Sequence, residues 1–197
     1  MRPRPLSRRQ ALTGSILMPM AAGFALPAGA GQSPAGGEIL VACFSHTGNT
    51  RVIAGQIRRA SGADIFAIEP AEPYPEDYEA TVRQAQRERD GNYEPPLRAT
   101  IGNIAGYRIV YLGFPIWGMT APSVIRSFLS AHDLAGKTLV PFITHGGYGL
   151  GQSLTVLSRH APKARLIEGL TMQADQERDT LAQVTSWLGA IETGGRK

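Results

Sequence analysis

Cysteine is almost absent from this sequence: Cys43 is the only one in 197 residues, so no internal disulfide can form. The four histidines and this cysteine lack the spacing of a metal site, and we expect no metal. Neither Ser45 nor Ser153 lies in the G-x-S-x-G elbow of many hydrolases. Gly136-Lys137-Thr138 lacks the glycine five positions earlier that a nucleotide-binding P-loop requires. These absences disfavour an internal disulfide, a metal site, a hydrolase of the elbow type and a P-loop. We expect Cys43 to be a small buried apolar residue at a strand end.

Charged residues are also absent between Arg9 and Glu38. The pair Arg8-Arg9 precedes a mildly apolar stretch, 11–26, and small residues at 28–30 offer a cleavage site. This pattern resembles a bacterial twin-arginine export signal. We therefore expect residues 1–30 to be a signal peptide, 31–37 to be a linker, and the protein to be periplasmic or otherwise exported.

Two alternatives for the leader stay open, an uncleaved membrane anchor and a disordered tail. The apolar stretch 11–26 carries one proline, Pro19, and is shorter than the roughly 20 residues that a spanning helix needs. We favour export, with no stable membrane insertion after signal removal.

The basic excess of the chain comes from its leader. Arg2, Arg4, Arg8 and Arg9 are four of the 20 Lys and Arg residues, and from Gly31 onward 16 basic residues balance 16 acidic ones. Since nucleic-acid binding needs a basic face on the folded domain, we expect no nucleic-acid partner. The remaining chain is long enough for one domain with a substantial core.

Strand-like and helix-like patterns alternate through this remaining chain. Apolar runs predict five strands: Glu38–Phe44, Asp64–Ile68, Arg108–Phe114, Thr138–Ile143 and Arg165–Leu170. Helical periodicity predicts five helices: Asn49–Ala60, Glu76–Asp90, Pro122–Ala131, Gly151–His160 and Asp175–Ile191. This alternation predicts an α/β fold with a parallel sheet covered on both faces.

Three loops should meet at the carboxyl edge of such a sheet, where ligands bind. The first, Ser45–Thr50, offers hydroxyls, an amide and the N–H groups of a helix N-terminus, which suit a phosphate. The second, Pro115–Thr120, places Trp117 on a turn, and the third, Thr144–Leu150, is rich in glycine with one aromatic residue. Together they favour a ligand with a phosphate at one end and a flat conjugated ring at the other.

Several short motifs resemble those of the flavodoxin-like family, in its compact bacterial branch. They are Ser45–Thr50, Glu72–Tyr78, Gly113–Trp117, Ala121-Pro122, Phe128-Leu129, Gly136-Lys137-Thr138 and Thr144–Gly147. The resemblance implies a doubly wound, five-stranded parallel sheet of order 2-1-3-4-5 in residues 38–192, with bound flavin mononucleotide (FMN). It leaves the long segment 69–107 without an assigned role, although this segment could cover the flavin or a partner surface.

The resemblance also implies roles within the three loops. Side chains and N–H groups of the first loop would hold the phosphate, Trp117 and Tyr148 would lie against the isoalloxazine, and Gly118 would let its peptide reorient. Backbone N–H groups of the third loop would reach the pyrimidine edge of the ring. The implied cofactor site comprises Ser45, His46, Thr47, Gly48, Asn49, Thr50, Pro115, Ile116, Trp117, Gly118, Thr144, His145, Gly146, Gly147, Tyr148 and Gly149.

Simpler interpretations of single residues stay open. Trp117 and Tyr148 can be ordinary packing residues, and His46 and His145 can be loop residues that touch no ligand. Tyr78 and the residues from Arg83 to Arg89 can belong to a solvated amphipathic helix.

The function that follows is an FMN-dependent redox protein, either an electron carrier or a small reductase of quinone reductase type. Its partners would be a protein or quinol electron donor and acceptor. The neutral charge after the leader weakens the pure carrier version, since carriers of this family are usually strongly acidic. The alternative is a flavodoxin-shaped binding or scaffold module without redox activity. No residue stands out as a catalytic acid or base.

Overall fold

A computed structural model describes residues 38–173, 184 and 186–191. The expected signal peptide, the linker and most of the expected helix Asp175–Ile191 lie outside the described residues, while residues 184 and 186–191 of that helix are helical. The strands are β1 (Ile39–Cys43), β2 (Asp64–Ala67), β3 (Ile109–Pro115), β4 (Thr138–His145), β5 (Arg165–Leu166) and β6 (Leu170–Gln173). The helices are α1 (Asn49–Ser61), α2 (Tyr78–Asp90), the 3-10 turn η1 (Ile104–Gly106), α3 (Ser123–Ala131) and α4 (Ser153–His160).

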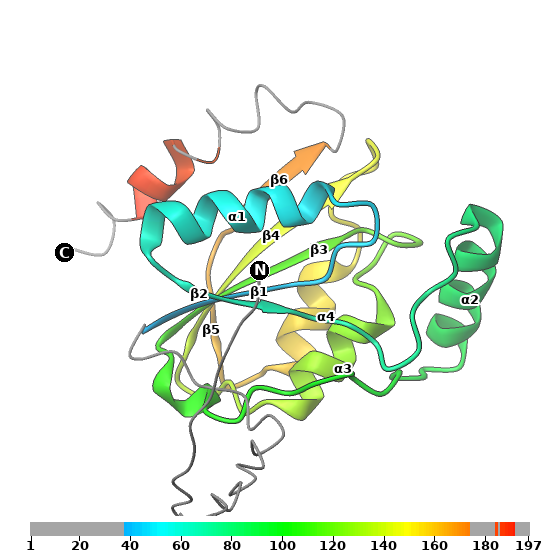
Figure 1. Ribbon diagram of the computed structural model, residues 1–197, viewed down its shortest axis with the longest axis horizontal. Helices are drawn as coiled ribbons and strands as arrows, with labels where there is room; N and C mark the ends of the chain where they lie inside the picture. Colours follow the sequence, from blue (N-terminus) through cyan, green and yellow to red (C-terminus); the bar gives the residue numbers. More distant parts are fainter. Residues whose placement is uncertain (1–37, 174–183, 185, 192–197) are drawn as a thin grey trace, which may run out of the picture. The chain divides into compact units, whose positions relative to one another are not determined.

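All strand pairs run parallel, in the order β2-β1-β3-β4-β5, with β6 also paired to β4. The sheet confirms the predicted α/β class and the order 2-1-3-4-5. Figure 1 shows α1 on one face of the sheet and α3 and α4 on the other. The strand order reverses at β1, between β2 and β3, so the carboxyl ends of β1 and β3 form the edge where ligands of such folds bind.

Apolar side chains form one core on each face of the sheet. Phe114, Ile125 and Phe128 are fully buried in the core under α3, and Ile57 and Phe142 are fully buried in the core under α1. The continuously apolar strands predicted this arrangement, because a strand covered on both faces buries every side chain.

The predicted strand Arg165–Leu170 is interrupted and forms β5 and β6 instead. Arg165 pairs with Thr138 whereas Leu170 pairs with Phe142, so this edge holds one residue more than β4 does. Such an extra residue is a β-bulge. The sequence-based prediction of one continuous strand is therefore wrong at this edge.

Pro141 in β4 explains the interruption. The N–H group of Ile167 donates to the carbonyl of Leu139, so alternate residues of β4 face this edge. Pro141 is the next such residue, and proline has no N–H group to donate. A Cβ at Gly169 would collide with the Pro141 carbonyl oxygen, so the backbone of the bulge passes too close for any residue but glycine.

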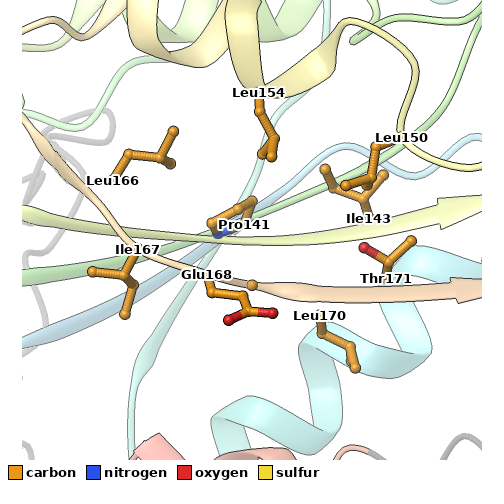
Figure 2. Close-up of a pocket in the computed structure, with 10 residues that line it drawn as sticks. Pro141, Ile143, Leu150, Leu154, Leu166, Ile167, Glu168, Leu170 and Thr171 are labelled. Carbon is orange, nitrogen blue, oxygen red and sulfur yellow. The ribbon is translucent and has the colours of Figure 1, made fainter.

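A cavity of about 380 Å³ lies between α4 and this interrupted edge. Figure 2 shows Leu154 pointing from α4 toward Pro141. The residues that line the cavity are mostly apolar: Pro141, Ile143, Leu150, Leu154, Leu166, Ile167, Glu168, Gly169, Leu170 and Thr171. The cavity therefore opens at the outer edge of the sheet, away from β1 and the first loop.

Between β2 and β3 the chain makes a closed detour, residues 70–97, which we call the α2 excursion. Its neck is an antiparallel bridge between Pro70 and Leu97, and Arg98 donates to the Glu69 carboxylate at 2.7 Å. Within it, α2 begins at Tyr78 because the Asp77 carboxylate caps it by accepting from the Ala80 N–H group. The paired neck returns the chain to the sheet close to where it left.

Lys137 holds the segment that follows the excursion. Its buried ammonium donates to the carbonyls of Tyr107, at 2.6 Å, and Ala105, at 3.2 Å. Within the motif Gly136-Lys137-Thr138, Lys137 therefore ties the segment before β3 to the start of β4.

Candidate functional site

The three predicted loops lie together at the carboxyl edge of the sheet (Figure 1). The hydroxyl oxygens of Thr50 and Thr144 are 2.9 Å apart, which ties the first loop to the third. The N–H group of Ile116 donates to the Thr144 carbonyl, and that of Gln152 donates to the Met119 carbonyl, each at 2.8 Å. The second loop is thus joined to the start of the third loop and to Gln152, two residues beyond its end.

The first loop leads into α1 through Gly48. This residue has a left-handed backbone, φ 102°, and as a glycine it offers no side chain to cap the helix. The N–H groups of the first turn have no partners inside the helix, and together with the helix dipole they favour an anion. A Cβ at Gly48 would have no neighbour within 4 Å, so the space beside the loop is open to a ligand.

The polar side chains of the first loop differ in access. Thr47 and Asn49 are exposed and Ser45 is half-buried, with its oxygen accepting from the Arg51 N–H group at 3.2 Å. Thr50 is only 1% exposed and its hydroxyl pairs with Thr144, so this side chain joins loops. The backbone N–H group of Thr50 still lies in the first turn of α1.

The second loop holds Trp117 among aromatic neighbours. The half-buried indole meets the rings of Phe44, Tyr74 and His46 nearly at right angles, with ring centres 5.1, 4.8 and 5.7 Å apart. Edge-to-face contacts of this kind stabilise a ring in one orientation. Pro115 and Ile116, which lead into the loop, are half-buried.

A tight turn follows Trp117. Trp117 and Thr120 exchange backbone hydrogen bonds at 3.0 and 3.3 Å, and the two central residues, Gly118 and Met119, have φ of 56° and 64°. Positive φ at both central residues is the type I′ geometry, which glycine adopts without strain and methionine does not. The sequence predicted a special backbone at Gly118 but gave no sign of the same conformation at Met119.

The third loop is shaped by His145. Its Nδ1 atom accepts from the N–H groups of Gly147, at 3.0 Å, and Gly149, at 3.4 Å. These two N–H groups were expected to reach the ligand, and here they fix the loop. Tyr148 is 80% exposed at the loop's tip and Gly146 is exposed.

Two residues beside the second loop were missed by the sequence analysis. Tyr74 packs on Trp117, and its hydroxyl donates to the Glu88 carboxylate at 2.8 Å. A Cβ at Gly118 would collide with the Arg89 guanidinium, so Arg89 lies directly against the turn. The solvated-helix interpretation fits Tyr78 but is wrong for Glu88, which is 5% exposed.

Burial sets the acidity of two groups near the site. It raises the pKa of Cys43 to about 11, so this residue is a neutral thiol, as its interpretation as a buried apolar residue implied. Burial, and then the Glu88 carboxylate, raise the pKa of Tyr74 well above its usual value, so its hydroxyl keeps the proton that it donates. Cys43 and Tyr74 therefore both stay protonated, and neither supplies an anionic nucleophile to the site.

Within residues 38–173, 184 and 186–191, no group of three or more His, Cys, Asp or Glu residues could hold a metal ion. Nor does any described helix combine the length and apolar character that crossing a membrane demands.

Comparison with known proteins gives consistent results. A family model described as Flavodoxin matches residues 38–191. A flavoprotein structure from Bacteroides eggerthii is 35% identical over 78% of this chain and 97% of its own, with a TM-score of 0.68. One from Bacteroides uniformis is 29% identical over 76% and 99%, with a TM-score of 0.67.

A flavoprotein from Lactobacillus acidophilus, solved in complex with FMN, is 18% identical over 73% of this chain and 97% of its own, with a TM-score of 0.61. At that identity the likeness shows the fold. No curated protein matches the chain.

Proposed function

Because this chain belongs to the flavodoxin family, we propose that it binds FMN at the three converging loops and transfers electrons outside the cytoplasm. The observation that carries the proposal is the convergence itself. A helix N-terminus that begins after a glycine, which suits a phosphate, shares one edge of the sheet with a fixed indole, which suits a flat ring.

The residues present fit the two ends of FMN. The N–H groups of Asn49 and Thr50, with the accessible side chains of Ser45, Thr47 and Asn49, would hold the phosphate. Gly48 leaves open space there, and no acidic side chain lies within residues 45–50 to repel an anion. The Lactobacillus acidophilus relative, solved with FMN, supports this choice of cofactor.

Trp117 would contact the flat ring of the cofactor, and His145 would hold the third loop beside it. FMN supplies the redox chemistry when bound, by accepting and donating one or two electrons. The protein's part is to bind the phosphate, orient the ring and leave one edge open for a partner.

The partner would be a protein or quinol electron donor and an acceptor. Met119 and Tyr148, at the tips of the second and third loops, are exposed by 48% and 80%. Exposed apolar and aromatic side chains beside a site are typical of surfaces that contact a partner. This supports either an electron carrier or a small reductase of quinone reductase type.

Export through the twin-arginine route is part of the proposal and rests on Arg8-Arg9. That route carries folded proteins, so FMN could be loaded before transport. A fusion of residues 1–37 to a reporter should reach the periplasm, and an Arg8→Lys, Arg9→Lys pair should hold it in the cytoplasm. A reporter that stays cytoplasmic with both arginines intact would reject this part.

The redox proposal is tested by the absorbance spectrum of the purified protein, followed by anaerobic reduction. A yellow protein that reduces in two one-electron steps supports a carrier. Direct two-electron reduction with turnover of a quinone supports a reductase. A colourless protein that ignores added FMN would contradict both versions and leave a flavodoxin-shaped binding or scaffold module.

A further inference from the structure

The α2 excursion delivers side chains to the candidate site although none of its residues belongs to the three loops. Its neck is closed by the Pro70–Leu97 bridge, and its end is held by Arg126 of α3. Arg126 donates to the carbonyls of Glu88, at 3.2 Å, and Tyr93, at 2.9 Å. The excursion is therefore anchored at both ends, which allows it to hold a neighbouring element in place.

Tyr74 is the side chain through which the excursion meets the site. Its ring centre lies 4.8 Å from that of Trp117, with the planes at 81°, and 5.6 Å from that of Phe44. Of the three aromatic neighbours of Trp117, His46 is exposed and Phe44 follows β1. Tyr74 thus supplies a buried wall for the indole from outside the sheet.

Glu88 fixes Tyr74 in turn. One carboxylate oxygen accepts from the Tyr74 hydroxyl at 2.8 Å, and the other accepts from the Gln84 side-chain amide at 2.9 Å. A buried carboxylate lowers the stability of the fold unless its oxygens accept hydrogen bonds. The Tyr74 hydroxyl must therefore stay within hydrogen-bond distance of Glu88. The ring of Tyr74 consequently has little freedom to turn away from Trp117.

We propose that the α2 excursion is a positioning element of the site, in which the Tyr74–Glu88 pair sets the orientation of Trp117 for its ligand. Tyr74 and Glu88 are positioning residues, because they act through the indole. The proposal rests on the proposed function only for the identity of that ligand, since the solvent accessibility of Trp117, which changes when the indole turns, can be measured without FMN. It gives residues 70–97, the larger part of segment 69–107, a role that the sequence left open.

The test follows Trp117 by its fluorescence, in full-length protein that carries Trp187→Phe so that Trp117 is the only indole. Acrylamide quenching is measured without FMN, and the FMN dissociation constant is measured separately. Tyr74→Phe keeps the ring and removes the hydroxyl, and Glu88→Ala removes its acceptor. Both should raise the quenching constant of Trp117 and raise the FMN dissociation constant by about threefold to tenfold, the equivalent of one aromatic contact.

Two further variants separate positioning from simple stabilisation. Glu88→Gln retains an acceptor for the Tyr74 hydroxyl and should restore both readouts to nearly the parent values. Tyr78→Phe makes the same chemical change on an exposed side chain of the same excursion and should change neither. If Tyr74→Phe fails to fold, Gln84→Ala, at a half-buried position, weakens the same pair and should raise both constants in the same direction.

Folded Tyr74→Phe and Glu88→Ala variants that match Tyr78→Phe in both readouts would overturn the proposal. So would a Glu88→Gln variant as defective as Glu88→Ala. If the parent protein ignores FMN, the proposed function fails, and the quenching series alone still decides whether Tyr74 positions Trp117.

Discussion

Thr50 and Thr144 stand 94 residues apart in the chain, yet their hydroxyl oxygens lie 2.9 Å apart in the buried floor of the candidate site. Thr50 lies in the first turn of α1 and Thr144 is the next-to-last residue of β4, so a single hydrogen bond joins the phosphate-type loop to the glycine-rich loop. This bond is the most direct sign that the two loops act as one site.

Replacing Thr50 with valine should show how much that hydrogen bond contributes to the free energy of unfolding. The variant leaves the buried Thr144 hydroxyl without its partner, which should lower the free energy of unfolding by about 1–3 kcal/mol. Thr50→Val with Thr144→Val removes both polar groups and should recover much of the loss. Urea unfolding of the two single variants and the double variant measures the coupling, and strictly additive losses would show that the hydroxyls do not interact.

Thr47 should matter for the ligand and not for the fold, because its side chain is exposed. Thr47→Ala removes a hydroxyl expected to bond a charged phosphate, so the FMN dissociation constant should rise about tenfold while stability stays unchanged. Fluorescence titration of bound flavin measures this, with exposed Thr155→Ala as the control. An unchanged dissociation constant would remove Thr47 from the phosphate site.

Gly118→Ala should be destabilising for two separable reasons. A left-handed backbone costs a non-glycine residue about 1–2 kcal/mol, and the new Cβ would also collide with Arg89. Adding Arg89→Ala should remove the collision and leave the backbone strain. Gly136→Ala is the matched control, because Gly136 has φ 72° and open space around it. Thermal unfolding should rank Gly118→Ala as the least stable of the three.

His132 should make the fold sensitive to mild acid. The buried ring accepts from the Ile101 N–H group at 2.9 Å and bonds the Phe128 carbonyl at 2.8 Å, and burial lowers its pKa below the usual 6.5. Above pH 6.5 the His132 ring is neutral in both the folded and the unfolded chain, and its contribution to stability is fully present. As the pH falls through 6.5 the unfolded chain binds a proton that the folded chain resists, so stability declines toward the folded pKa.

A His132→Gln variant isolates this effect, since glutamine keeps an acceptor and a donor but does not titrate. Urea unfolding at pH 7, 6 and 5 should show a weaker decline for His132→Gln than for the parent, by at most about 1.4 kcal/mol per pH unit. Exposed His46→Gln should follow the parent. Parallel pH curves for His132→Gln and the parent would contradict this assignment.

The parallel sheet covered on both faces and the meeting of the three loops could be predicted because both follow from local patterns. The strand order came from the family resemblance. Continuous apolar runs mark strands covered on both faces, and the loops after parallel strands must share one edge. In those loops, the residue types of Gly48, Thr50 and Trp117 were enough to predict a ligand site. The interrupted edge could not be predicted in this way, because it depends on Pro141 of β4 lying against Gly169, which stands between β5 and β6.

The support behind Trp117 was equally hidden. In the sequence, Glu88 is one of several charged residues on a polar helix, and nothing there predicts that it is buried. Only the folded chain shows its carboxylate buried against Tyr74. His145 likewise shows no pattern that foretells an imidazole accepting from two glycine N–H groups. Contacts between residues far apart in the chain decide such details, and their partners carry no matching local signal.

The most direct measurement of the central claim is a titration of the full chain with FMN and, in parallel, with riboflavin, which has the same ring and no phosphate. If the three loops hold a phosphate at one end and a flat ring at the other, FMN should bind one per chain with its fluorescence quenched, and riboflavin should bind at least about tenfold more weakly. Failure of FMN to bind, or equal affinity for the two compounds, would contradict the account.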